Sequence, residues 1–221
     1  MISSRYLKAA GLALVAALVS LACASTPRTR YYTMRLSPPP RAQGPGTHFI
    51  LQVEHFAAPS LLQDNRIIYY TSPTELNFHE YHRWSSQPGE LLSDLAMKYF
   101  AEKGLFRQVY SYPAPVDADF TLRGRLLDLG EMRYEKDGRG KKGEARIGLE
   151  LDLLQTHENK VVWSARLEQT EPVETKKVQA YVEAMNVAAQ QLLQQAYAGI
   201  SQVVEHQAAQ MQQKQHQEQA H

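Results

Sequence analysis

The chain has 221 residues, a formal net charge of +1 and one cysteine, Cys23. A charge this close to zero creates no field that would attract nucleic acid or another polyanion, so we expect no nucleic-acid partner. The length is sufficient for one domain with a hydrophobic core and tails.

The N-terminal segment has the three-part layout of an export signal. Arg5 and Lys8 supply positive charge, residues 9–21 are apolar, and small residues surround Cys23. The apolar run is shorter than the roughly 20 residues that a membrane-spanning helix needs. One interpretation is an ordinary signal peptide with an incidental cysteine. The other interpretation is a lipoprotein signal, whose cysteine is acylated and becomes the new N-terminus. The position of the only cysteine favours this second interpretation.

Residues 19–23, VSLAC, resemble a bacterial lipobox, although Ser20 replaces the leucine most often found three positions before the cysteine. We therefore expect residues 1–22 to be a signal peptide, Cys23 to be the lipid attachment site and residues 23–30 to be a lipidated tether. Several acyl chains together give effectively permanent membrane binding. Ala24, in place of the aspartate that holds such proteins at the inner membrane, favours the outer membrane, with the protein body in the periplasm.

Four strands are predicted in the first part of the mature chain. The prolines at 38–40, followed by Gly44, Pro45 and Gly46, exclude a helix or a central strand between the first two. Ser72-Pro73 is a turn signal, so the last two strands form a hairpin. The predicted strands are residues 31–36, 48–55, 67–71 and 76–81.

Two helices are predicted from apolar residues at helical spacing. The first, residues 90–103, ends before Gly104, and a short strand at 106–110 follows it. The second helix spans residues 177–204, with a stripe that runs from Tyr181 to Val203. The Gln- and His-rich segment 206–221 has too few apolar residues for a core, so we expect it to be disordered.

Between these helices, apolar and mostly polar residues alternate in three successive segments, residues 120–127, 147–154 and 161–168. This pattern is typical of an antiparallel meander with one covered face. Residues 137–140 and 157–160 are the predicted turns. The sequence therefore predicts an α+β fold, an antiparallel β-sheet with two helices packed on one face, in one domain of residues 31–205.

No catalytic motif is recognisable in the sequence: GxSxG, HExxH and Walker A patterns are absent. We expect no enzyme activity, no cofactor and no metal. His79 and His82 lie three residues apart, so on a regular strand they would point to opposite faces and could not share a metal ion. The histidines of the tail lack the fixed geometry of a specific metal site.

The most aromatic stretch of the mature chain lies in the predicted hairpin. Only alternate side chains of a strand can face one core, so some of these rings must face elsewhere. Core packing is one interpretation, and a contact surface for a subunit or a partner is the other. The candidate interaction residues are Tyr69, Tyr70, Phe78, Tyr81 and Trp84.

Three segments of the sequence resemble segments found in members of the ABC-type transport auxiliary lipoprotein family, the family of paraquat-inducible protein C. They are RYYTMRL at 30–36, RIIYYTSPTELNFHEYHRWSSQPGELL at 66–92 and KGLFRQV at 103–109. The similarity extends over residues 31–204, and the chain departs from the family pattern mainly in its Gln- and His-rich tail.

The resemblance implies a non-catalytic outer-membrane lipoprotein that acts with an ABC permease, an ATPase and a mammalian-cell-entry (MCE) domain protein in lipid transport. It also implies a homo-oligomeric ring. Two alternatives remain at this point. The first is a structural or assembly lipoprotein of another envelope complex. The second is a periplasmic hydrolase whose catalytic residues are dispersed in the sequence and converge in a pocket.

Overall fold

The computed structural model describes residues 27–40, 46–133, 143–175 and 177–219. The predicted signal peptide, Cys23 and the turn at 137–140 therefore lie outside the described residues. Within the described part of the chain, no helix is both long and apolar enough to cross a membrane.

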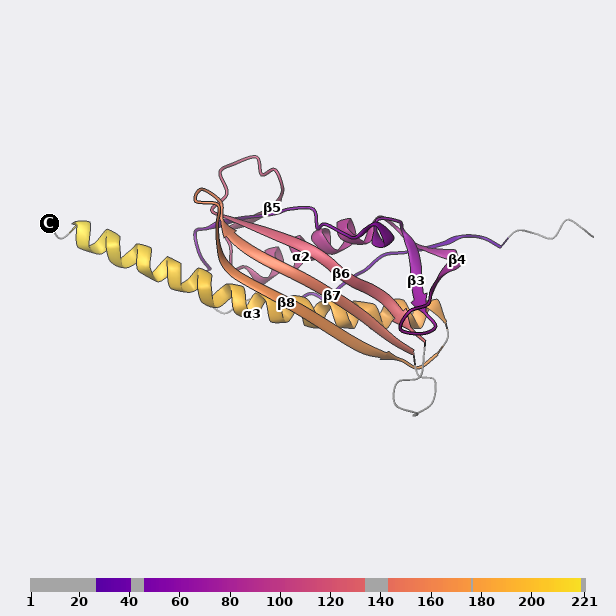
Figure 1. The fold of residues 1–221 in the computed structure, drawn as a ribbon. Coiled ribbons are helices and arrows are strands. Elements are labelled where there is room, and N and C mark those ends of the chain that lie inside the picture. Colours follow the sequence, from indigo (N-terminus) through magenta and orange to yellow (C-terminus); the bar gives the residue numbers. More distant parts are fainter. Residues whose placement is uncertain (1–26, 41–45, 134–142, 176, 220–221) are drawn as a thin grey trace, which may run out of the picture.

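Eight strands form one sheet, and three of them make its long antiparallel ladders (Figure 1). The central strand is β6 (Phe120–Met132), which pairs along one edge with β7 (Gly143–Gln155), and β7 pairs with β8 (Lys160–Val173). These strands confirm the predicted meander and extend beyond its predicted ends. The remaining strands are β1 (Arg30–Tyr32), β2 (Ile50–Val53), β3 (Arg66–Tyr70), β4 (Leu76–Trp84) and β5 (Gln108–Ser111).

The sheet is antiparallel in its long ladders, as the sequence predicted, and it also contains short parallel pairs. The second edge of β6 is shared by two short strands, β2 at its beginning and β3 at its end, and both run parallel to it. The pairs β1–β4 and β2–β5 are also parallel. The predicted β3–β4 hairpin is antiparallel, as expected. The α+β class is confirmed.

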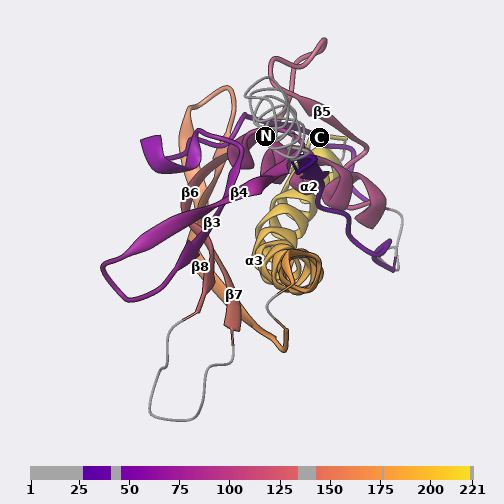
Figure 2. The same ribbon diagram turned by 90° about the vertical axis from the view of Figure 1, so that its right-hand side faces the viewer.

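Two helices pack on the same face of the sheet (Figure 2). Helix α2 (Pro88–Lys103) begins with proline and ends at Gly104, whose φ of 72° is a left-handed conformation that glycine adopts without strain. Helix α3 (Val178–Gln219) lies along β7 and β8. Its buried stripe ends at Val204 rather than at the predicted Val203. The members of the stripe with 0% exposure are Tyr181, Met185, Ala188, Leu192, Ala196, Ile200 and Val204. A short 3-10 helix, η1 (Ser60–Leu62), lies between β2 and β3.

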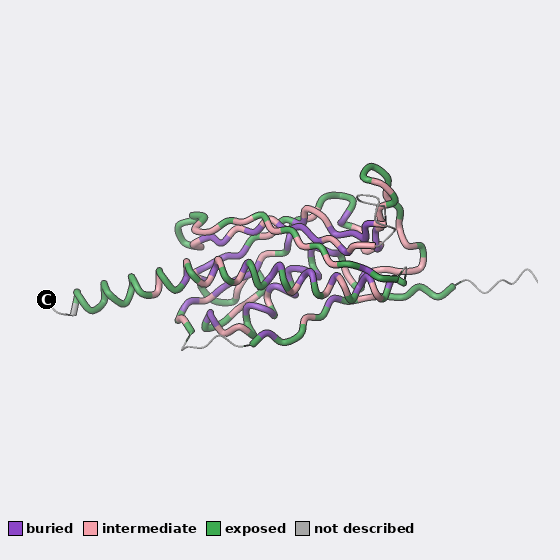
Figure 3. Tube along the Cα trace, turned by 90° about the horizontal axis from the view of Figure 1, so that it is seen from below, coloured by how far each residue is buried: buried purple, intermediate pink, exposed green. Residues whose placement is uncertain are grey.

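The segment predicted to be a disordered tail is helical as far as Gln219, because α3 continues through it. Residues 209–218 are exposed on every side, and they extend beyond the sheet (Figure 3). Ala, Gln, Met, Lys and Glu have favourable helix propensities, and extension of an existing helix avoids the cost of nucleation. Low apolar content therefore prevented packing of this segment without preventing its helical conformation.

Candidate functional site

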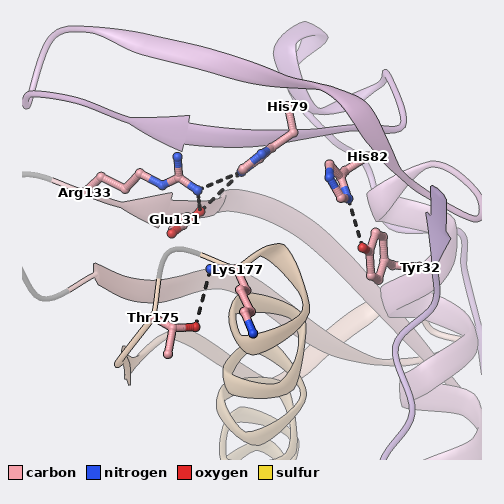
Figure 4. Close-up of polar contacts among 7 residues, drawn as sticks. All are labelled: Tyr32, His79, His82, Glu131, Arg133, Thr175 and Lys177. Atoms are coloured by element: carbon pink, nitrogen blue, oxygen red, sulfur yellow. Dashed lines mark hydrogen bonds and ion pairs between the residues drawn. The ribbon is translucent and has the colours of Figure 1, made fainter. Parts of the chain in front are cut away.

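A polar cluster lies at the end of the sheet where the β3–β4 hairpin meets the end of β6. The parallel pairing of β3 with β6 sets Tyr69 beside Glu131, and the backbone N–H of Arg133 donates to the carbonyl of Tyr70 at 2.9 Å. His79 projects from β4 towards Glu131 and Arg133 (Figure 4). We call His79, Glu131 and Arg133 the polar cluster.

Glu131 is 1% exposed because a register shift places it on the covered face of β6. Leu126 faces the core, but the register shifts between Leu126 and Asp128. Beyond this shift, Leu129 and Glu131 lie opposite the buried Ile147 and Ala145 of β7. The face of β6 that carries buried leucines earlier in the strand therefore carries a buried carboxylate at the end of the strand.

Two side chains compensate the buried carboxylate. A terminal nitrogen of Arg133 lies 2.8 Å from Oε2 of Glu131, and Nε2 of His79 lies 3.3 Å from the same oxygen. Burial raises the pKa of Glu131, but the hydrogen bonds and charges of His79 and Arg133 outweigh it and hold this pKa below 4.5, its ordinary value. A buried carboxylate is tolerated only when it is paired in this way.

His79 and His82 lie on the same side of β4, which corrects the prediction that they point to opposite faces. Their ring centroids are 5.7 Å apart. The register between β3 and β4 shifts between the pairs Arg66–Arg83 and Ile68–Phe78, so the strand does not alternate regularly here. Among the described residues, no group of three or more His, Cys, Asp or Glu side chains is arranged to hold a metal ion.

His82 is held by Tyr32 of β1. The hydroxyl of Tyr32 lies 2.9 Å from Nδ1 of His82, and the two rings are stacked with centroids 5.6 Å apart (Figure 4). Burial lowers the pKa of His82, and the nearby His79 and Arg30 lower it further. His82 is therefore a neutral hydrogen-bonding group near neutral pH.

Tyr181 lies on the first turn of α3, near enough to Glu131 to interact with its charge, and is completely buried. Its hydroxyl has no hydrogen-bond partner among the described residues. Burial, followed by the negative charges of Glu131 and Asp128, raises the pKa of Tyr181 well above its ordinary value. The hydroxyl therefore remains protonated, and it adds a polar group to the core without a hydrogen bond to the described part of the chain.

The five candidate interaction residues fall into two groups. Trp84 is 1% exposed and packs against Tyr181, with ring centroids 6.1 Å apart, so it belongs to the core. Tyr69, Tyr70, Phe78 and Tyr81 are half-buried. The guanidinium of Arg133 lies 4.3 Å from the ring centroid of Tyr69.

Two other rings of this set have close neighbours. The guanidinium of Arg66 lies 3.7 Å from the centroid of Phe78. Tyr70 packs on Gly130, where a β-carbon would come within 2.7 Å of its ring. These contacts leave part of each ring accessible, and the role of the set as a contact surface stays a prediction.

Sequence reasoning missed Glu131 and Arg133. The strand was predicted to end at residue 127, because Asp128 and Glu131 interrupt the apolar alternation. The available signal was Leu129, three residues after Leu126, which begins an alternation displaced by one residue; Glu131 takes an inward position of that alternation and gives no apolar signal itself. Only the pairing with β7 shows that the displaced register is the one used.

Two hollows adjoin the polar cluster, and Arg133 lines both. One, of about 350 Å³, lies between the cluster and the segment after β8, and Tyr69, Glu131 and Glu174 are among its lining residues. The other, of about 480 Å³, lies between β1, β4 and the start of α3. Arg30, Tyr32, His79, His82, Arg133, Lys177, Val178 and Gln179 line this second hollow.

No curated protein matches the chain by sequence. Among solved structures, a Xanthomonas campestris protein of the DUF330 family is similar at 19% identity and a TM-score of 0.70, over 82% of this chain and 99% of that chain. A second structure, of an uncharacterized protein, is similar at 18% identity and a TM-score of 0.58, over 80% of this chain and 98% of the other. At these identities the two structures show the shared fold alone.

The family relationship comes from the sequence of the domain. The family described as "ABC-type transport auxiliary lipoprotein component" matches residues 32–196, which include every strand from β2 to β8, helix α2 and most of the packed part of α3. The resemblance seen in the sequence motifs is therefore confirmed. The chain belongs to the family of ABC-type transport auxiliary lipoprotein components.

Proposed function

We propose that this protein is an outer-membrane-anchored periplasmic lipoprotein that acts as a non-catalytic auxiliary component of an ABC/MCE-type lipid transport system. The observation that carries the proposal is the family match over residues 32–196. The lipobox-like segment that ends at Cys23 supports the anchoring, and Ala24 supports the outer membrane as its site. Its partners are an MCE-domain protein and an ABC permease with its ATPase, and it assembles as a homo-oligomeric ring.

The anchoring is tested by labelling cells with a fatty-acid analogue. We expect the wild-type chain to incorporate the label and the Cys23→Ser variant to incorporate none. Fractionation of the wild type should place the chain in the outer membrane. Equal labelling of the two proteins would contradict lipidation, whereas labelled protein in the inner membrane would contradict only the proposed location.

We assign the partner contact to the half-buried aromatic residues of the β3–β4 hairpin, Tyr69, Tyr70, Phe78 and Tyr81. Aromatic side chains often dominate the energy of an interface, because they bury a large area at low entropic cost. A ring that is half-buried in the free subunit is already oriented, and association covers its remaining surface. Trp84 is excluded from this contact because it is buried in the core.

The contact is tested by co-purification from cells that carry a tagged full-length chain. The variant Tyr81→Ser should lose the MCE protein, the permease and the ATPase. Tyr112→Ser is the matched control, because Tyr112 is 57% exposed in the loop after β5, outside the hairpin. If both variants retain all three partners, the contact lies elsewhere on the surface.

The alternative function is a structural or assembly lipoprotein of another envelope complex. It predicts that the wild-type chain captures other envelope proteins and neither the MCE protein nor the permease. Quantitative mass spectrometry of the same co-purified material separates the two functions. Size-exclusion chromatography of the purified chain tests the ring independently, since a monomer would contradict it.

A further inference from the structure

The hollow between β1, β4 and α3 has a strongly positive lining. Arg30, Arg133 and Lys177 are basic residues, and no acidic side chain is among its eight lining residues. Glu131, the carboxylate of the polar cluster, is 1% exposed and offsets the charge of Arg133, with which it pairs at 2.8 Å. Arg30 and Lys177 form no ion pair within the described part of the chain. The hollow therefore keeps an excess of positive charge.

Arg133 uses only part of its hydrogen-bonding capacity within the described part of the chain. One terminal nitrogen contacts Glu131 and His79. Nε is buried, so a ligand in the hollow would be met by the terminal N–H groups. A guanidinium has five N–H donors, and a phosphate or carboxylate group can accept two of them at once. Tyr32 and His82, which bind each other, fix the opposite wall of the hollow (Figure 4).

The start of α3 forms a third side. The backbone N–H groups of Ala180 and Tyr181 donate to the carbonyl of Lys177, at 3.0 and 3.3 Å. Val178 and Gln179 precede them and line the hollow. The first amides of a helix have no partner within the helix, and its N-terminal end carries a partial positive charge that favours anions.

We propose that this hollow is a binding site for a phosphate group. Arg30 of β1, Arg133 after β6 and Lys177 before α3 all line it, so positively charged residues border a ligand on several sides. A tetrahedral phosphate presents oxygens in several directions, whereas a planar carboxylate presents two oxygens in one plane. A volume of about 480 Å³ also leaves room for the rest of a small phosphodiester.

The position of the hollow relates it to the membrane, and this step rests on the proposed anchoring. Arg30 follows Cys23 by seven residues, which span at most about 25 Å when fully extended. The hollow would therefore remain close to the headgroup layer. A headgroup phosphodiester and free inorganic phosphate share the same chemistry, so the test compares the two sources.

The test is isothermal titration calorimetry on the full-length chain in a neutral detergent at low ionic strength. The ligands are inorganic phosphate and glycerophosphoglycerol, the deacylated headgroup of phosphatidylglycerol, with glycerol as the uncharged control. We expect both phosphate compounds to bind and glycerol not to bind. Tighter binding of the diester identifies a lipid headgroup as the source, and tighter binding of inorganic phosphate identifies the soluble ion. Absence of binding by both compounds overturns the proposal.

Variants localise the binding. Arg30→Gln and Lys177→Gln should each weaken binding about tenfold, because each removes a charge at the ligand. Both side chains are exposed, so these changes leave the core intact. Lys160→Gln is the matched control. Lys160 is the exposed first residue of β8, whereas the start of α3, which lines the hollow, follows the last residue of that strand. This substitution should leave binding unchanged. Equal binding by wild type and the Arg30→Gln/Lys177→Gln double variant overturns the proposal.

The outcomes for this site and for the proposed function are separable. A wild-type chain that carries no lipid label, or that captures none of the three partners, refutes the proposed function while phosphate binding in solution still stands. Failure of phosphate binding refutes the site and leaves the anchoring and partner experiments unaffected.

Discussion

The variant Arg133→Met separates a structural role of the polar cluster from an incidental contact at the surface. Arg133 contacts the buried Glu131 at 2.8 Å, and its own side chain is 25% exposed. Methionine keeps much of the aliphatic volume and removes the guanidinium. The carboxylate of Glu131 then remains buried, with His79 as its remaining neighbour in the cluster.

The expected magnitude follows from the cost of an unpaired buried charge. Removal of one partner of a buried ion pair costs about 3–5 kcal/mol. Because His79 still lies 3.3 Å from the carboxylate, we expect the lower end, about 3 kcal/mol. In a domain of this size, that loss corresponds to a decrease in Tm of about 6–12 °C.

Thermal and urea unfolding near neutral pH measure this change. The matched control is Arg166→Met, because Arg166 pairs with Glu168 on the surface, where the side chains are 69% and 54% exposed. An exposed pair of this kind contributes less than about 1 kcal/mol. If Arg133→Met and Arg166→Met have the same small effect, Glu131 does not depend on Arg133 for its compensation.

The pH dependence supplies a second readout. The pKa of Glu131 lies below 4.5, so its ionised form contributes stability that is present above pH 4.5 and is lost as the pH falls through the folded-state pKa. In Arg133→Met this pKa rises, because one of the causes that lower it is removed. The difference in unfolding free energy between wild type and variant should therefore be largest above pH 4.5 and shrink below it. A difference that stays constant across this range would show that the loss arises from packing.

Three further changes test the packing around the cluster and along α3. Tyr181→Phe removes a buried hydroxyl without a described partner, so the free energy of unfolding should stay within about 0.5 kcal/mol or increase; a loss above about 1.5 kcal/mol in urea would reveal a bond to that hydroxyl. Trp84→Ala should cost about 3–5 kcal/mol by the same measurement, because Trp84 is 1% exposed in the core, and a variant as stable as wild type would contradict that assignment. Truncation after Glu205 removes a mostly exposed helical segment and should lower the free energy of unfolding by less than about 1 kcal/mol; a decrease in Tm of several degrees would show that the segment packs on the body or on a neighbouring subunit.

The sequence by itself determined the elements whose signals are local. Period-two alternation identified β6, β7 and β8, because each side chain of a regular strand reports the face on which it lies. Apolar residues at helical spacing identified α2 and α3, and Gly104 marked the end of α2 because glycine alone adopts a positive φ without strain. The family motifs are likewise continuous segments of the chain.

The tertiary structure decided what depends on pairing between distant segments. The short strands β1, β2 and β5 join the sheet in parallel pairs, and a short segment carries too few side chains to indicate its neighbours. The register shift in β6 placed Glu131 inside, and the register shift between β3 and β4 brought His79 and His82 together. A shift of one residue exchanges the two faces of a strand, and only the partner strand fixes the register. For this reason the polar cluster became visible only when β4, β6 and the segment after β6 were placed side by side.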